Sequence, residues 1–357
     1  MPQLTPEALE DAAIALLIEL IKTPSLSRAE DRTADLLVEF LRRHGAEPQR
    51  AGNNVWARNR HFDAAKPTIL LNSHHDTVKA GASWTYDPHG AVVEGDRLTG
   101  LGSNDAGAAA VSLLATFLYF HERRDLAYNL ICAITAEEEI SGAGGIRSVL
   151  PLLPPLALGI VGEPTQMDLA VAEKGLVVLD CTAHGRTGHA ARDEGENALY
   201  KALDDILWIR SYQFPDVSPL LGPVKMTVTQ IEAGSQHNVV PDRCRFVVDV
   251  RTNECYTNEQ VVELVRRHVQ AEVTPRSTHL NSSRIAPDHP LVQRGLAQGR
   301  RTFGSATLSD QSMMPFATVK VGPGDSARSH TPDEYILLSE IRGGIRGYVQ
   351  LLEGLEL

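Results

Sequence analysis

Two hydrophobic periods alternate along the chain. Thr5 and Pro6 form a typical helix start, because threonine can cap a helix and proline suits its first position. The apolar residues that follow at helical spacing are Leu9, Ala12, Ala13, Leu16, Leu17 and Leu20. Further helices are predicted over residues 30–44, 108–121, 287–304 and 340–352, and apolar strands over 68–72, 126–135 and 317–321. This alternation predicts an α/β fold with a mostly parallel, mixed sheet.

The pattern changes at Gly175. From there, strands and helices follow in the order β-α-β-β-α-β, which is the order of the ferredoxin-like α+β unit. The predicted elements are strands at 175–184, 224–231, 243–251 and 273–279 and helices at 197–212 and 258–269. We therefore expect two domains. Residues 1–174 and 281–357 would form the α/β domain, and residues 175–280 would be inserted into it.

Composition and charge narrow the class of protein. The 357 residues are 43% hydrophobic and 22% charged, as in an ordinary folded enzyme or binding protein. A net charge of -11 repels nucleic-acid phosphates and anionic membranes, so neither is expected as a partner. A secretory leader is not recognisable, and no run approaches the roughly 18 apolar residues of a membrane span, so we expect a cytoplasmic protein.

The four cysteines are far apart in the sequence, and no CxxC pair occurs. They are Cys132, Cys181, Cys244 and Cys255. Three of them lie in or beside apolar strand-like runs. This favours buried free thiols over a disulfide framework or a cysteine metal site.

Polar residues at the ends of apolar strands are the first candidates for chemistry, because ligands of open α/β sheets bind at the carboxyl ends of the strands. His74 and Asp76 follow the run TILLN and point to the same face of an extended chain. Asp76 could therefore hydrogen-bond one imidazole nitrogen of His74 and leave the other free for a metal. The alternative is a solvated turn.

Two further turns carry acids. Asp105 lies in a glycine-flanked turn before the alanine-rich helix, where it could equally be a helix cap. Glu137, Glu138 and Glu139 follow the strand that ends at Thr135. Three adjacent carboxylates repel one another, so they are either all solvated or held by a cation, in which case one can bind metal while another moves protons.

Glu163 ends another apolar run, and His330 lies in a loop behind the strand ATVKV. Each residue alone is unremarkable, but together they repeat the strand-end pattern in chain order. The resulting nitrogen and oxygen ligand set suits zinc, although cobalt and manganese accept similar ligands. Five ligands exceed one tetrahedral catalytic site and fit two metals about 3.5–4 Å apart with a bridging carboxylate. The set is His74, Asp105, Glu139, Glu163 and His330.

The order of these segments resembles the M20 family of metallohydrolases, which includes acetylornithine deacetylase, succinyl-diaminopimelate desuccinylase, acetylcitrulline deacetylase and the glutamate carboxypeptidases. The resemblance covers nearly the whole chain. It implies a zinc-exopeptidase-like catalytic domain with two divalent metal ions, held by the five residues above, with Asp105 as the bridge. His74 and Glu163 would hold one metal, and Glu139 and His330 the other. Asp76 would orient His74, and Glu138 would be the general acid/base.

The inserted domain resembles the dimerisation domain of the family. The segment GRTGH places His189 at the position of a histidine that reaches the partner subunit's active site and stabilises the oxyanion. Asn238, in QHNVVP, and Arg251 resemble substrate-binding positions, Arg251 for the α-carboxylate. A homodimer through this domain is expected. Two departures from the family are Asn104-Asp105-Ala106-Gly107, where Asp-Met-Lys-Gly is more usual, and the RTGH of the oxyanion segment.

The resemblance implies an amidohydrolase that removes the acyl group from a small amino acid. The first choice is N-acetyl-L-ornithine, with acetylcitrulline or succinylornithine close behind, in arginine biosynthesis. The alternatives are succinyl-diaminopimelate desuccinylase, a dipeptidase or carboxypeptidase, and a catalytically inactive binding protein on the same fold.

Overall fold

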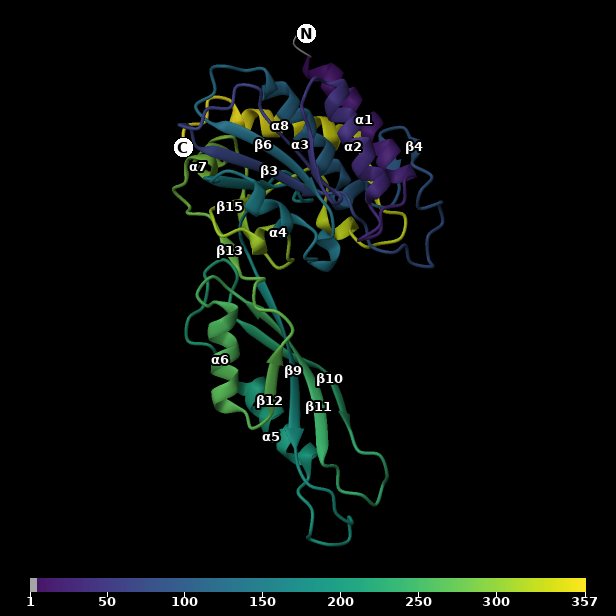
Figure 1. Cartoon of the computed structure of the whole chain (residues 1–357), viewed down its shortest axis with the longest axis vertical. Coiled ribbons are helices and arrows are strands. Elements are labelled where there is room, and N and C mark those ends of the chain that lie inside the picture. Colours follow the sequence, from purple (N-terminus) through teal and green to yellow (C-terminus); the bar gives the residue numbers. More distant parts are fainter. Residues whose placement is uncertain (1–4) are drawn as a thin grey trace. The chain divides into compact units, whose positions relative to one another are not determined.

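The computed structural model describes residues 5–357, and its chain divides into two compact units (Figure 1). The first unit runs to Val171 and continues with Ile285–Phe303 and Ser309–Leu357. The second unit is Ala172–Arg284 with Gly304–Leu308. Two of the boundaries lie within four residues of the sequence-based ones at 175 and 280, and the chain enters the second unit once more at Gly304–Leu308, which the sequence did not predict.

The first unit is built on a mixed sheet, as predicted. The strand order is β1-β2-β6-β3-β7-β15-β8-β13, with β14 paired to β8. The four central strands β6, β3, β7 and β15 are parallel, whereas β1, β2 and β8 are antiparallel to their neighbours. The strands are β1 (Gln49–Ala51), β2 (Asn54–Arg58), β3 (Thr68–His74), β6 (Asn129–Thr135), β7 (Leu158–Val161), β8 (Leu169–Glu173), β13 (Ser283–Arg284), β14 (Thr302–Ser305) and β15 (Thr318–Lys320).

Helices cover the sheet, and a small three-stranded sheet lies apart from it. The helices are α1 (Pro6–Lys22), α2 (Asp31–Arg43), α3 (Ala108–His121), α4 (Ile146–Val149), α7 (Pro290–Ala297) and α8 (Leu338–Leu352). The small sheet has the order β16-β5-β4 and consists of β16 (Tyr335–Leu337), β5 (Arg97–Thr99) and β4 (Val92–Glu94). Within residues 5–357, no helix is long and apolar enough to cross a membrane.

The sheet is buried on both faces because its central strands are apolar on both. Every residue of β3 and β6 is buried. Ile69 and Leu71 join a core with α1, α3 and α8, while Leu70, between them, joins a core with α4 on the opposite face. Strands of a parallel sheet that is covered on both faces need continuous apolar runs. For this reason TILLN and LICAI could be recognised as strands from the sequence.

The register brings the strand ends together. His74 at the end of β3 pairs with Thr135 at the end of β6, and Asn72 pairs with Val161 at the end of β7. The residues that follow these strands therefore emerge at one edge of the sheet. That edge carries most of the predicted chemistry.

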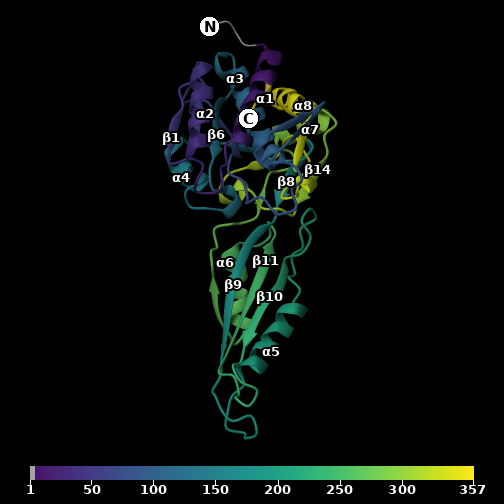
Figure 2. The same cartoon turned by 90° about the vertical axis from the view of Figure 1, so that its right-hand side faces the viewer.

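The second unit has the predicted β-α-β-β-α-β order (Figure 2). Its sheet is fully antiparallel in the order β10-β11-β9-β12, and alternate residues of its long strands form a core with both helices. The elements are β9 (Gly175–His184), α5 (Ala198–Ser211), β10 (Lys225–Ala233), β11 (Arg243–Thr252), α6 (Asn258–His268) and β12 (Glu272–Pro275). Thr257 and Gln260 form a capping box at the start of α6.

Two local predictions were wrong. The helix predicted over residues 287–304 is only α7, because the chain adopts a left-handed conformation at Gly299 (φ +81°) and then pairs as β14 with β8. Cys255 is exposed in the turn after β11, whereas Cys132, Cys181 and Cys244 are buried. All four cysteines are free, so burial was overpredicted for Cys255 alone.

Candidate metal centre

The five predicted ligands all belong to the first unit, and each comes from a different segment. His74 ends β3, Glu139 lies in the helical turn η2 (Glu138–Ile140) after β6, and Glu163 follows β7. Asp105 lies in the turn η1 (Ser103–Gly107) before α3, and its peptide bond to Ala106 is cis. The fifth, His330, lies in the loop between η5 (Ser326–Arg328) and β16.

Asp105 faces two histidines with its two carboxylate oxygens. Its Oδ1 lies 3.4 Å from His74 Nε2, and its Oδ2 lies 3.4 Å from His330 Nε2. Each histidine also has its own glutamate, with 3.6 Å from His74 Nε2 to Glu163 Oε1 and 3.0 Å from His330 Nε2 to Glu139 Oε2. One carboxylate thus stands between two histidine–glutamate pairs, which is the arrangement that a bridging ligand requires.

His74 Nε2 gives an independent sign of a cation. This atom is buried and has no hydrogen-bond partner among residues 5–357. Its neighbouring carboxylate oxygens, on Asp105, Glu163 and Glu138, lie 3.4, 3.6 and 3.8 Å away, beyond normal N–H···O distances. An imidazole nitrogen surrounded by carboxylates at these distances is typical of a metal ligand.

The electrostatics of the carboxylates lead to the same conclusion. Burial raises the pKa of Glu138 well above its usual value, that of Glu163 to about 8 and that of Glu139 to about 6. Repulsion between the carboxylates adds to the effect of burial on all three. A divalent cation would relieve both penalties. The nitrogen and oxygen donors therefore fit two divalent metal ions.

Asp76 contacts His74, as the sequence analysis expects, and three further groups. Its Oδ1 lies 3.3 Å from His74 Nδ1, on the side of the ring opposite the carboxylate cluster. The same carboxylate accepts hydrogen bonds from the backbone N–H groups of Glu138 (3.1 Å) and Glu139 (3.2 Å) and from the hydroxyl of Ser27 (2.7 Å). Asp76 thus fixes His74 and the Glu138–Glu139 turn relative to each other.

The three consecutive glutamates separate, as the cation hypothesis requires and the solvated-turn alternative does not. Glu138 Oε2 lies 3.8 Å from His74 Nε2, and Glu139 contacts His330. Glu137 adopts a left-handed conformation (φ 56°), and its carboxylate accepts a hydrogen bond from the N–H of Gly144. Glu137 is thus directed to a neighbouring loop, and two of the three acids serve the cluster.

The residue before Asp105 in the turn, Asn104, is held to Asp325 by two hydrogen bonds. The side-chain amide of Asn104 donates to the carbonyl of Asp325 (3.1 Å), and its oxygen accepts from the N–H of the same residue (3.0 Å). Gly102 is required in the same turn, because its φ is +75° and an added Cβ would lie 2.6 Å from a methyl carbon of Thr77.

Sequence reasoning missed two buried carboxylates beside the site. Asp310, in η4 (Asp310–Met313), accepts a hydrogen bond from the hydroxyl of Thr135 (2.8 Å), and burial raises its pKa to about 6. Glu334 contacts the backbone of the Asp105 turn. Neither residue follows an apolar strand directly, so the strand-end criterion passed over both.

The other predicted residues, His189, Asn238 and Arg251, lie in the second unit at opposite ends of its sheet. His189 and Asn238 are exposed in the loops beyond the His184–Arg243 pair, where β9 ends and β11 begins. Arg251 comes eight residues after Arg243, about 26 Å along an extended strand. The structure therefore does not bring these three residues together within one chain.

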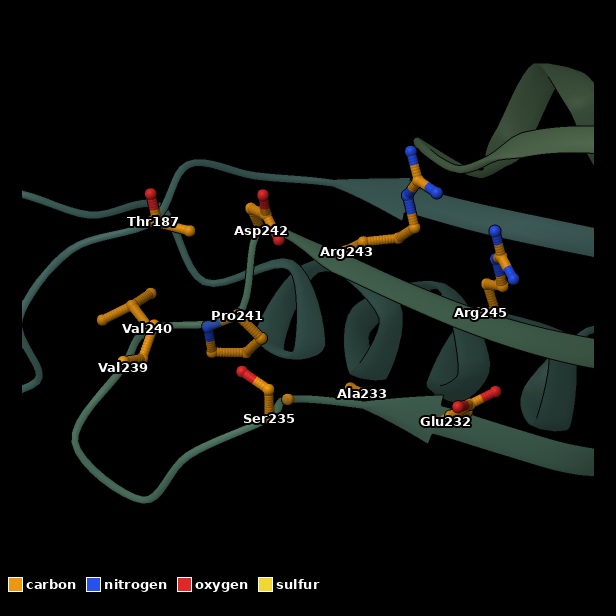
Figure 3. Close-up of a pocket in the computed structure, with 11 residues that line it drawn as sticks. Thr187, Glu232, Ala233, Ser235, Val239, Val240, Pro241, Asp242, Arg243 and Arg245 are labelled. Atoms are coloured by element: carbon orange, nitrogen blue, oxygen red, sulfur yellow. The ribbon is translucent and has the colours of Figure 1, made fainter.

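Arg251 pairs with a neighbouring residue of its own strand, and the loops at the other end of the sheet line a pocket. The guanidinium of Arg251 is bidentate to the carboxylate of Asp249, at 2.8 and 3.1 Å. At the opposite end, the loop after β9 and the turn between β10 and β11 enclose a pocket of about 340 Å³. Figure 3 shows Thr187, from the loop with His189, across from Val239 and Pro241 of that turn.

Comparison with known proteins identifies the relatives of this chain. The family model described as peptidase family M20/M25/M40 matches residues 70–354. Succinyl-diaminopimelate desuccinylase 2 of Ruegeria sp. (strain TM1040) is 26% identical over 92% of this chain and 91% of its own length. Succinyl-diaminopimelate desuccinylase of Dinoroseobacter shibae is 28% identical over 73% of each chain.

Solved structures share the fold. An M20 family metallo-carboxypeptidase from Sulfolobus solfataricus superimposes with a TM-score of 0.73 at 17% identity, covering 95% of this chain and 98% of the other. The YXEP protein of Bacillus subtilis, described as a dinuclear metal-binding peptidase of the M20 family, also gives 0.73, at 18% identity over 97% and 98%. These likenesses support the mixed α/β fold described above.

The position of Asp105 between two histidines generates a prediction about metal binding. Asp105→Ala should weaken binding at both metal positions, because one carboxylate serves both, whereas His330→Ala should empty mainly one. Even outer-shell partners of ligands contribute about 10–100-fold to metal affinity, so each loss should be at least about tenfold. Stoichiometric titration of the metal-free variants with Zn²⁺ measures this. Loss of a single site in both variants would remove Asp105 from the bridging role.

Proposed function

We propose that this chain, which belongs to peptidase family M20/M25/M40, is a two-metal amidohydrolase that removes the acyl group from the nitrogen of a small amino acid. The observation that carries the proposal is Asp105, which lies between the His74–Glu163 and His330–Glu139 pairs with Glu138 beside them. The description of a structural neighbour as a dinuclear metal-binding peptidase supports it. The native metal is proposed to be zinc, with cobalt or manganese as alternatives.

Two bound metal ions would polarise the amide carbonyl and lower the pKa of an attacking water toward neutrality. The chain supplies the proton transfer. Glu138 accepts the proton of the attacking water and passes it to the leaving nitrogen, which converts a poor leaving group into an amine. Asp76 positions this residue through its backbone N–H and holds the His74 ring through Nδ1.

N-acetyl-L-ornithine is the first proposed substrate, with acetylcitrulline and succinylornithine next, which would place the enzyme in arginine biosynthesis. This choice rests on the segment Val321-Gly322-Pro323-Gly324 before the metal histidine, which resembles the acetylornithine and acetylcitrulline branch. Succinyl-diaminopimelate is the second candidate, because relatives at 26% and 28% identity carry the name of its desuccinylase. All of these substrates share an acyl amide beside a carboxylate.

A substrate panel tests the choice. Metal-loaded protein should release amine from N-acetyl- or N-succinyl-ornithine or -citrulline with a kcat/KM at least about tenfold above that for succinyl-diaminopimelate, a ratio within reach of a single binding pocket. A reversed ratio would identify a desuccinylase, and turnover of dipeptides alone a peptidase. If the protein binds both metals but turns over none of these substrates, it is a catalytically inactive binding protein on the same fold.

A homodimer through the second unit is also proposed, with His189 stabilising the oxyanion in the partner's active site. Asn238 and His189 lie in loops beyond Arg243, which is about 26 Å from Arg251 along the extended strand, farther than a small acyl amino acid extends. Such residues contact one substrate only if they come from two copies of the chain.

The surface of the second unit offers an interface for such a dimer. β10 is an edge strand, and α5 exposes the apolar side chains of Tyr200 (66%), Leu203 (43%) and Leu207 (58%) at helical spacing. Open strand edges and contiguous exposed apolar residues are typical of interaction surfaces. A two-fold axis beside them would bury both at once.

Subunit exchange between two inactive variants tests the shared active site. Glu138→Gln should bind both metals yet lose about 10²–10⁴-fold in turnover, because the amide cannot take the proton. His189→Ala should also be impaired. In a mixed dimer, one active site would combine an intact Glu138 with an intact His189 from the partner. Activity should therefore rise toward about half of the wild-type value per mixed dimer, if the two sites of the two-fold dimer act independently.

The control is a mixture of each variant with itself, which should show no gain. Exchange is verified by differently tagged subunits that co-purify. If tagged mixed dimers form and no activity returns, His189 acts within its own subunit or outside catalysis.

A further inference from the structure

Glu334 is a buried acid that the proposed chemistry does not use. It is 2% exposed and lies four residues after His330. Its carboxylate accepts three backbone hydrogen bonds from the Asp105 turn, from the N–H groups of Asn104 (2.8 Å), Asp105 (2.9 Å) and Gly102 (3.3 Å). A side chain from the loop of one proposed ligand thus binds the main chain of another.

The Asp105 turn needs such an acceptor. Asp105 has φ -112° and ψ 101°, which are not helical, so its N–H does not enter the hydrogen-bond ladder of α3. Consecutive N–H groups in a tight turn point to a common side and form a natural anion site. A buried carboxylate satisfies all three N–H groups at once, whereas buried N–H groups left without an acceptor destabilise the folded chain.

The His330 loop is held by other contacts as well. Asp333 accepts hydrogen bonds from the N–H groups of Thr85 (2.8 Å) and Tyr86 (3.1 Å). Arg328 is bidentate to Glu340, at 2.6 and 3.1 Å. These contacts fix the loop against segments without proposed ligands. The side chain of Asn104 also connects the Asp105 turn to this part of the chain, through Asp325 and Ser329. What Glu334 adds is a carboxylate that accepts directly from the N–H of Asp105.

We propose that Glu334 is a positioning residue that sets the place of the Asp105 carboxylate relative to His330, so that metal affinity depends on it. The inference rests on the proposed function only in taking Asp105 and His330 as metal ligands. Glu334 is not one of the five proposed metal ligands. It acts through the backbone of residues 102–105, which carries the carboxylate that faces both histidines.

The test is titration of the metal-free, full-length protein with Co²⁺, at a temperature where circular dichroism shows every variant folded. Glu334→Gln keeps the shape of the side chain but turns one acceptor into a donor that faces a backbone N–H. The Co²⁺ dissociation constant should rise about 10–100-fold, the usual effect of losing an outer-shell partner. Asp333→Asn is the matched control, because it weakens the same kind of contact one residue away but does not touch the Asp105 turn. It should leave Co²⁺ affinity unchanged.

A purely structural role for Glu334 would lower thermal stability but leave the Co²⁺ affinity of the folded protein intact, and this result would overturn the inference. Equal weakening in Asp333→Asn would do the same, since the effect would then belong to the whole loop. If Glu334→Gln fails to fold, Glu334→Asp replaces it, because the shorter acid keeps the charge but loses the reach. A wild-type protein that takes up no Co²⁺ would overturn both this inference and the proposed function. If Glu334→Gln binds two Co²⁺ ions as tightly as the wild-type protein does, the inference about Glu334 is overturned, and the proposed function is not affected.

Discussion

Several carboxylates share a small, poorly solvated volume with the unpaired Nε2 of His74, and the rest of the site depends on how that charge is balanced. Burial and mutual repulsion raise the pKa values of Glu138, Glu139 and Glu163. Such a cluster would be costly in an otherwise apolar α/β domain unless cations occupied it. The five residues with N and O donors, Asp105 among them, are a ligand set that suits two divalent ions. Two bound ions would both relieve the repulsion between the carboxylates and supply the proposed chemistry.

Backbone hydrogen bonds to buried carboxylates hold this arrangement in place. Asp76 receives the N–H groups of Glu138 and Glu139, and Glu334 receives those of Asn104 and Asp105. In both cases, an acid that is not a proposed ligand fixes the main chain of an acid that is one: Asp76 fixes Glu139, and Glu334 fixes Asp105. Hydrogen bonds therefore connect the turns that carry the ligands, although the ligands come from loops.

The sequence was informative where one segment carries its own signal. The runs TILLN and LICAI are apolar on both faces, so β3 and β6 and the polar residues at their ends were legible. The family resemblance then added roles for those residues. Contacts between distant segments left no such signal, as with Ser27 on Asp76 across 49 positions and Glu334 on Asn104 across 230. The strand β14 was missed because its pairing with β8 overrides a local helical pattern.

The central claim is that Asp105 bridges two metal ions, and anomalous X-ray diffraction at the zinc edge from crystals of Zn²⁺-loaded protein tests it most directly. The account predicts two anomalous peaks about 3.5–4 Å apart on either side of the Asp105 carboxylate. One should lie beside His74 and Glu163 and the other beside His330 and Glu139. A single peak at saturating Zn²⁺, or two peaks with Asp105 bound to neither or only one, would contradict it.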